Sequence, residues 1–284
     1  MAGFASATGV HLSYASDYLP GDKGWAGLDQ QSRLTKFLGP WQGSPYRLVL
    51  GVPVIPEVDG RAVATLAAGA AGSYDPQFTT LARSLVSYGA GNAVLRLGWE
   101  FNEPWEPWAV ANAADAAHFA GYFRRIVAAM RAVPGTSFQF DWNPAPGPGP
   151  IDLALAYPGD ASVDLIGLDI YDETWSSPET PSVAWAGNDT GPNGLEWMAT
   201  FAAAHHKAMS IPEWGVTIRS DGHGLGDDPA FVFRVAAWAA SHNVAFVSYF
   251  DIDVSDGRHN LLDGDLFESR AEFTLLFGSS GATG

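Results

Sequence analysis

Short apolar runs alternate with longer amphipathic segments along almost the whole chain, and this alternation limits the possible folds more than any other feature. Apolar runs of four to eight residues are typical of strands whose two faces are both covered, and longer segments with a period near 3.6 are typical of helices. The apolar runs predict strands at 10–14, 47–54, 93–99, 137–143, 163–171, 208–213 and 245–251. The segments between them predict helices near 28–37, 75–88, 113–133, 194–205, 229–242 and 270–277. Strands that alternate with helices indicate an α/β protein with a parallel sheet.

A closed (β/α)8 barrel fits this alternation better than an open sheet. The chain has 284 residues, 47% of them hydrophobic, and keeps one rhythm throughout. No G-x-G-x-x-G sequence follows the first expected strand, which disfavours a dinucleotide-binding fold. Seven strands are predicted where a barrel needs eight, so we expect an incomplete or displaced first strand. Two arrangements stay open: 10–14 is the first strand and a short second strand lies in a loop, or the first strand is absent from this chain.

The domain organisation is expected to be simple. We predict one catalytic barrel domain over 1–284, with 278–284 as a flexible tail of small residues. No internal repeat interrupts it. The run P-A-P-G-P-G-P at 144–150 predicts a stiff loop that is too short to link two domains.

Charge and composition exclude several partner classes. Lys and Arg total 15 against 31 Asp and Glu, a net charge of −16 that repels phosphate backbones and anionic lipids. We therefore expect no nucleic-acid or membrane partner. There are no cysteines, which excludes disulfides and thiolate metal sites. Asp251, Asp253 and Asp256 lack the spacing of a calcium loop, so neither a metal nor a cofactor is expected.

The aromatic content indicates a ligand class. Eleven Trp residues are many for this length, and several lie beside Gly, Pro, Asn or Asp at expected strand ends. Trp197 and Trp238 have helical spacings and are expected to fill the core. Exposed Trp rings at strand ends are a usual platform for the apolar C–H faces of sugars.

Two expected strands end in a glutamate. The sequence L-R-L-G-W-E-F-N at 95–102 contains Glu100 directly after the expected strand, and M-S-I-P-E-W-G at 209–215 contains Glu213. Arg96 shares a strand face with Glu100, and a buried cation requires a partner. In barrel enzymes the carboxyl ends of the strands carry the active site. Two carboxylates at such ends suit glycoside hydrolysis, in which one attacks the sugar and the other, with a raised pKa, transfers the proton. The alternative, two separate structural salt bridges, is disfavoured because the motif occurs twice.

At this point the sequence resembles clan A glycoside hydrolases, and specifically a family 26-like group of β-mannanase and β-glucanase type found in actinobacteria. The motifs that carry the resemblance are A-S-D-Y-L-P-G-D (15–22), L-R-L-G-W-E-F-N (95–102), F-D-W-N-P (140–144), Y-P-G-D-A (157–161), I-G-L-D-I-Y-D (166–172) and I-P-E-W-G (211–215). The resemblance implies a barrel with Glu100 as acid/base at the end of strand four and Glu213 as nucleophile at the end of strand seven. It makes 47–54 strand three and 10–14 strand two. Family 26 has His directly before the acid/base, whereas this chain has Trp99, with Asn102 two positions after Glu100.

Further side chains at strand ends are candidates for substrate binding. Tyr171 resembles the tyrosine that holds the nucleophile in such enzymes. For each candidate a packing or loop-capping role stays open. The candidates are Arg96, Trp99, Asn102, Trp105, Trp108, Asp141, Trp142, Asn143, Asp169, Tyr171, Trp175, Trp214, Tyr249 and Asp251.

The expected function is that of a retaining, endo-acting β-glycoside hydrolase. By family analogy, β-mannan and β-glucan come first as substrates. A non-catalytic carbohydrate-binding barrel and a transglycosylase that uses the same two Glu are the alternatives. We expect a monomer that binds a polysaccharide or oligosaccharide. An extracellular location is expected although no signal peptide is present in this chain, and a cytoplasmic location stays open.

Overall fold

The computed structural model describes residues 1–278, which form two compact units. The unit that we call the amino-terminal unit is Tyr14–Gly167. The carboxy-terminal unit joins Met1–Ser13 to the chain from Leu168 onward.

Five parallel strands form the sheet of the amino-terminal unit. Each strand pairs with the next one in the order β1, β2, β5, β6, β7, and registers such as Leu50↔Leu95 and Arg96↔Asp141 align their carboxyl ends. All four residues of β5 are buried, as expected for a strand covered on both faces. The strands are β1 (Tyr14–Tyr18), β2 (Arg47–Val52), β5 (Val94–Leu97), β6 (Gln139–Trp142) and β7 (Leu165–Gly167). A separate antiparallel pair is formed by β3 (Glu57–Val58) and β4 (Arg61–Ala62).

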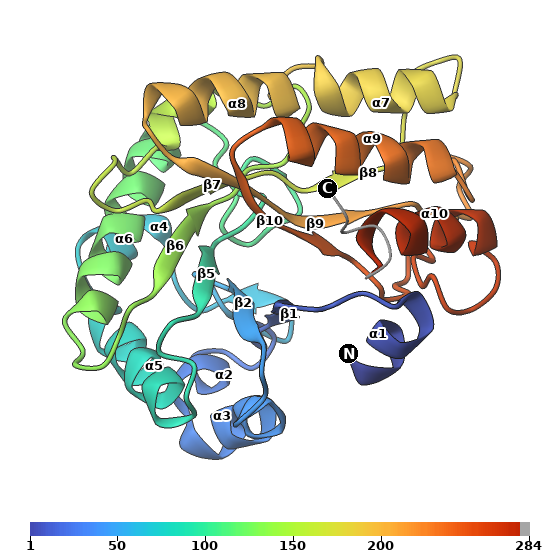
Figure 1. Ribbon diagram of the computed structural model, residues 1–284. Coiled ribbons are helices and arrows are strands. Elements are labelled where there is room, and N and C mark those ends of the chain that lie inside the picture. The colour runs from blue at the N-terminus through green and yellow to red at the C-terminus, as the bar shows by residue number, and fades with distance from the viewer. Residues whose placement is uncertain (279–284) are drawn as a thin grey trace. The chain divides into compact units, whose positions relative to one another are not determined.

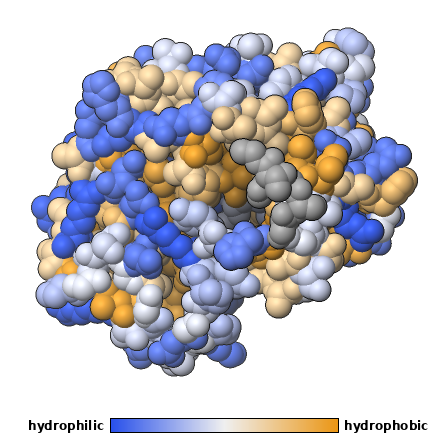
Figure 2. Space-filling view, viewed as in Figure 1, coloured by the Kyte–Doolittle hydropathy of each residue, from blue (hydrophilic) through white to orange (hydrophobic). Residues whose placement is uncertain are grey.

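Helices pack outside these strands, with α5 against α6 (Figure 1). The longest helix, α6, begins after Asn112, whose side-chain oxygen accepts hydrogen bonds from the Ala114 and Asp115 N–H groups. Its buried residues recur every three or four positions, which gives one apolar face. On the face of the molecule that Figure 2 shows, hydrophilic and hydrophobic residues are intermingled. The helices are α2 (Ala26–Asp29), α3 (Gln31–Leu38), α4 (Leu66–Ala70), α5 (Asp75–Ser87) and α6 (Ala113–Arg131), with 3-10 turns η1 (Gly39–Trp41) and η2 (Leu153–Ala156).

The carboxy-terminal unit contains three parallel strands. β9 (Ala208–Gly215) pairs with β8 (Ile170–Tyr171) on one side and with β10 (Val244–Tyr249) on the other. Its helices are α1 (Ala2–Thr8), α7 (Pro181–Asp189), α8 (Leu195–Ala204), α9 (Pro229–Ser241) and α10 (Phe267–Phe277). The first helix, α1, packs on α10, where the Phe4 and Phe273 rings lie 5.5 Å apart.

Most sequence-based elements are confirmed, but the first strand is wrong in its position, and the single strand expected at 163–171 is divided into β7 and β8. The segment expected at 10–14 contributes only Tyr14, because the pairing with β2 starts there and continues to Tyr18. Val10 forms an isolated bridge with Gly278. Among the described residues no strand precedes Tyr14, and 1–13 contain α1 in place of the displaced first strand that we expected. The short helices α1, α4 and α7 were not predicted.

The flexible tail expected at 278–284 lies outside the described residues except for Gly278, which ends α10. The single catalytic domain stays a prediction. Within 1–278, no helix is both long and apolar enough to cross a membrane.

Candidate active site

Glu100 lies just beyond the carboxyl end of β5, in a tight turn. Gly98 has φ 57° and Glu100 has φ 50°, a left-handed conformation that is uncommon for any residue with a side chain. The Glu100 N–H donates a hydrogen bond to the Asn143 carbonyl at 2.7 Å, which ties the turn to the end of β6. A Cβ at position 98 would approach Val54 Cγ2 to 2.9 Å, so glycine is required there. Such locally strained backbone is common at functional sites.

Arg96 is a buried cation beneath this turn. Its residue is 1% exposed, and its Nε donates to Asn143 Oδ1 at 2.7 Å. Its Nη1 donates to Tyr18 Oη at 3.2 Å. The register of β5 and β6 places Arg96 beside Asp141, which is also buried. The strand ends of β1, β5 and β6 are thus joined by one polar network.

Two tryptophans extend this network. Trp108 is buried and donates from Nε1 to the Trp99 carbonyl at 2.7 Å, with the two rings 4.6 Å apart. The Trp99 ring also lies 5.3 Å from that of Tyr18. Trp99 therefore occupies the position before Glu100 as a ring packed against both Trp108 and Tyr18.

The remaining substrate-binding candidates of the amino-terminal unit include both buried and exposed side chains. Asn102 is buried and exchanges two hydrogen bonds with the backbone of Ala145, at 2.9 and 2.8 Å, so it fixes the loop after Glu100. Trp142 is fully buried and packs on Phe101. Trp105, by contrast, is 69% exposed and accessible to a ligand.

Glu213 lies near the carboxyl end of β9 and is 8% exposed. Tyr171 Oη donates a hydrogen bond to Glu213 Oε2 at 2.9 Å. The register explains this contact, because Tyr171 is opposite Gly215, and Gly215 and Glu213 share one face of β9. A hydrogen-bonded carboxylate in a fixed orientation suits a nucleophile.

The Tyr171 ring is itself held by neighbours. His259 lies 5.2 Å and Phe250 lies 5.9 Å from it, measured between ring centroids. Burial lowers the pKa of the His259 imidazole, and its Nδ1 donates to the Val216 carbonyl at 3.1 Å. His259 was not identified from the sequence, because a single His in a loop of Gly, Asp and Asn residues carries no distinctive pattern.

Tyr249 and Asp251 fix the loop that carries His259. Tyr249 Oη donates to the His259 carbonyl at 2.9 Å, and Asp251 Oδ1 accepts from the Leu261 N–H at 2.9 Å. Burial raises the pKa of Asp251 to about 6. Trp214, one position after Glu213, is fully buried and packs on Tyr249, with ring centroids 5.0 Å apart.

Two buried aspartates accompany Tyr171. Asp169 is 2% exposed, and Asp172 is fully buried. Burial, aided by the charge of Asp228, raises the pKa of Asp172 to about 8, so this carboxyl is protonated at neutral pH. Beyond these residues, Trp175 is 64% exposed.

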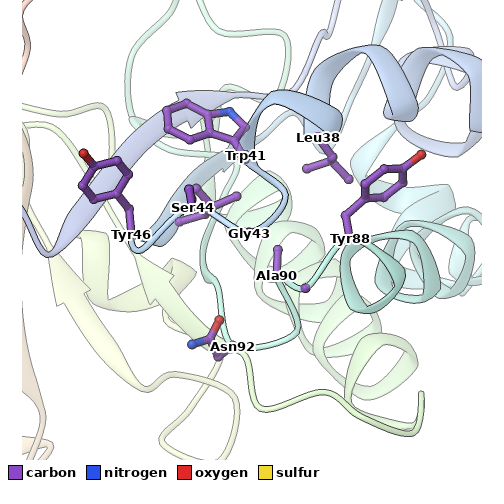
Figure 3. A pocket seen from close by; sticks show the side chains of 10 residues that line it. Leu38, Trp41, Gly43, Ser44, Tyr46, Tyr88, Ala90 and Asn92 are labelled. Carbon is purple, nitrogen blue, oxygen red and sulfur yellow. The ribbon is translucent and has the colours of Figure 1, made fainter. Parts of the chain in front are cut away.

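Two cavities lie within the separate units. One, of 160 Å³, is shown in Figure 3 and lies where β2 and β5 begin, between Trp41, Tyr46, Tyr88 and Asn92. It is therefore at the opposite strand ends from Glu100. The other, of 240 Å³, lies between the loops that follow β9 and β10 and is lined by Arg219 and Asp256. Among residues 1–278 no group of three or more His, Cys, Asp or Glu side chains could hold a metal.

No family model and no curated protein matches the chain. An endo-β-1,4-mannanase from Cellulomonas fimi is similar in structure, with a TM-score of 0.66 and 21% identity over 95% of this chain and 65% of that chain. A family 26 β-mannanase from Bacteroides ovatus gives a TM-score of 0.65 at 14% identity, over 98% of this chain and 82% of that one. The family 26 protein GH26C of a Muricauda species gives 0.65 at 12% identity, over 95% and 79%.

These likenesses cover nearly the whole chain, although the chain spans less than two thirds of the length of the Cellulomonas enzyme. They agree with the parallel strands and covering helices seen in each unit. The expected α/β class is confirmed: the chain has the (β/α)8 barrel fold of the glycoside hydrolase family 26 mannanases.

Proposed function

We propose that the protein is a retaining β-glycoside hydrolase of the family 26 type, with Glu213 as nucleophile and Glu100 as acid/base. The observation that carries the proposal is the hydrogen bond from Tyr171 to Glu213 at the carboxyl end of β9, in a chain with the family 26 fold. Active sites in this fold class lie at the carboxyl ends of the strands, where both glutamates are found.

The proposed reaction has two steps. In the first, the Glu213 carboxylate attacks the anomeric carbon while Glu100 gives its proton to the departing glycosidic oxygen. In the second, Glu100, now ionised, takes a proton from water, and this water attacks the same carbon and releases Glu213. The two inversions together retain the anomeric configuration.

Each supporting residue has a role in this mechanism. Tyr171 holds the nucleophile in one orientation, and His259 and Phe250 hold Tyr171. Pre-organisation of this kind reduces the reorganisation needed at the transition state. On the other glutamate's side, the Asn143 carbonyl and the glycine at position 98 fix the turn that presents Glu100.

The substrate that we propose is a β-linked polysaccharide that is cleaved at internal bonds. We propose β-mannan as the first choice of substrate and β-glucan as the second. The structural neighbours named as β-mannanases support β-mannan. The exposed rings of Trp105 and Trp175 support contact with several sugar units. We further propose that residues 1–284 act as one catalytic domain, as a monomer, outside the cell.

A release assay over plant, fungal and bacterial polysaccharides tests the function. The wild-type protein should release reducing sugar from at least one neutral β-glycan. Glu213→Ala should abolish release while oligosaccharide binding persists. Glu196→Gln, which neutralises an exposed glutamate on α8, is the matched control and should leave the rate unchanged. Near-normal release by Glu213→Ala would contradict the assignment, and binding without release by the wild type would indicate a non-catalytic carbohydrate-binding barrel.

A further inference from the structure

Three loops that follow β8, β9 and β10 are joined to one another by their backbones. Glu173 pairs with Gly224, and Ile218 pairs with Arg258, each in an isolated antiparallel bridge. The Thr174 N–H also donates to the His223 carbonyl at 3.0 Å. We call residues 172–175, 217–224 and 254–258 the rim. Because its three segments bind each other, the rim is formed before any ligand arrives.

Arg219 is the centre of the rim. Its Nη2 donates to Asp221 at 2.7 Å, and its Nη1 donates to Asp256 at 3.2 Å and Glu173 at 3.4 Å. Only 13% of its side chain is exposed, so the guanidinium is held in one orientation. It also lines the 240 Å³ cavity between the loops. The side chains of Asp221 and Asp256 are 43% and 61% exposed, so the rim presents carboxylate acceptors that Arg219 holds in place, as the hydroxyls of a sugar require.

The charge of the rim selects against anions. Three carboxylates, those of Glu173, Asp221 and Asp256, surround the single guanidinium of Arg219, and the second arginine of the rim, Arg258, is paired with Asp265. The whole chain carries a net charge of −16 as well. An anionic sugar is therefore disfavoured here, because a carboxylate on the ligand would meet like charges.

Trp175 supplies a large flat surface beside Arg219. The guanidinium carbon lies 5.5 Å from the centroid of the indole ring, and the His223 ring lies 5.1 Å away at 31°. These neighbours hold the indole in place, yet it is 64% exposed. An exposed, immobilised indole next to polar groups is suited to stack on the apolar face of a pyranose ring.

The position of this platform relates it to Glu213 within the same unit. Trp175 is four residues beyond Tyr171, which donates to Glu213. Four extended residues span at most about 14 Å, so a sugar chain that reaches Glu213 can also reach Trp175.

We propose that the rim is a secondary subsite that binds an uncharged pyranose of the substrate chain on Trp175 and on the carboxylates that Arg219 holds, away from the bond that is cleaved. This inference rests on the proposed function, since it places the same chain on Glu213 and on the rim. Such a subsite makes the affinity for the substrate depend on the length of the sugar chain, and it disfavours chains that place a uronic acid at the rim.

Isothermal titration calorimetry with β-1,4-linked manno-oligosaccharides, from the disaccharide to the hexasaccharide, tests the proposal. The Glu213→Gln variant binds without turnover and serves as the background. Adding Trp175→Ala should weaken binding of the longest oligosaccharide about tenfold, equal to about 1.4 kcal/mol, and leave the shortest bound ligand unchanged. Adding Trp175→Phe, which keeps a smaller ring, should give an intermediate loss. Phe233→Ala, which removes an exposed ring from α9, is the control and should change no affinity.

Equal affinities with and without Trp175 at every length would overturn the proposal, as would an equal loss at every length. A second measurement tests the charge argument: a manno-oligosaccharide with a terminal carboxylate should bind more weakly than the neutral one, and Asp256→Asn should reduce the difference. An unchanged difference would contradict a role of the rim carboxylates. Loss of release by Glu213→Ala, measured separately, keeps a failure of the rim distinct from a failure of the proposed function.

Discussion

The buried carboxyl of Asp172 makes the stability of this protein depend on pH in a direction opposite to that of an ordinary salt-bridged aspartate. Its pKa is raised to about 8 in the folded protein, from 3.8 for an unperturbed aspartate, by burial and by the charge of Asp228. Arg234 acts against this shift, and Glu173 adds to it. Between these two pKa values the folded state binds a proton that the unfolded state has lost. The stabilisation that this carboxyl contributes is therefore full below about pH 4, declines as the pH rises, and is lost once the pH has passed through about 8.

The magnitude follows from the size of the shift. Each pH unit between the two pKa values costs about 1.4 kcal/mol of unfolding free energy, so the interval from pH 5 to pH 7 costs up to about 3 kcal/mol. Asp172→Asn removes the ionisation while keeping the size and polarity of the side chain. We expect this variant to be more stable than the wild type at pH 7 and to lose the corresponding part of the pH dependence.

Thermal unfolding at pH 5, 6, 7 and 8 measures this difference, with calorimetry to follow the wild type and the variant. Asp59→Asn is the control, because Asp59 is exposed at a turn with φ 51°, a conformation that Asn also tolerates. If Asp172→Asn and the wild type lose stability in parallel from pH 5 to pH 8, the carboxyl is ionised in the folded protein and the reasoning is refuted.

Two further predictions concern the site directly. Tyr171→Phe removes the hydrogen bond to Glu213. Because hydrogen bonds to charged groups contribute about 1.5–3 kcal/mol, kcat should fall at least about tenfold with little change in KM. Steady-state kinetics on the best polysaccharide measure this, and an unchanged kcat would mean that the hydrogen bond has only a structural role. Gly98→Ala forces a side chain into a left-handed conformation and against Val54, so the unfolding free energy should fall by about 1–3 kcal/mol, and a melting temperature equal to that of the wild type would contradict the strain at this turn.

The sequence predicts the strands and long helices well because apolar runs and helical periodicity are local signals. The first strand is displaced because Tyr14–Tyr18 contains Ser16 and Asp17, which conceal the apolar pattern. Its pairing with β2 decides its place, and pairing between distant segments is not a local signal.

The site shows the same division between local and distant signals. Glu100 and Glu213 follow from strand ends, which the sequence displays. Trp142 and Trp214 are fully buried, and the alternation of side chains along a strand already places Trp214 on the face opposite to Glu213. Arg219 could not be found in this way, because one of its partners, Asp256, is 37 residues away and meets it only when the loops fold together.

The anomeric configuration of the first product tests the central claim most directly. Proton NMR during hydrolysis of the best β-linked oligosaccharide follows the two anomers before they equilibrate. With Glu213 as nucleophile and Glu100 as acid/base, the β-anomer should form first and the α-anomer should follow only by mutarotation. If the α-anomer forms first, the reaction inverts, and the two glutamates do not have the roles proposed for them.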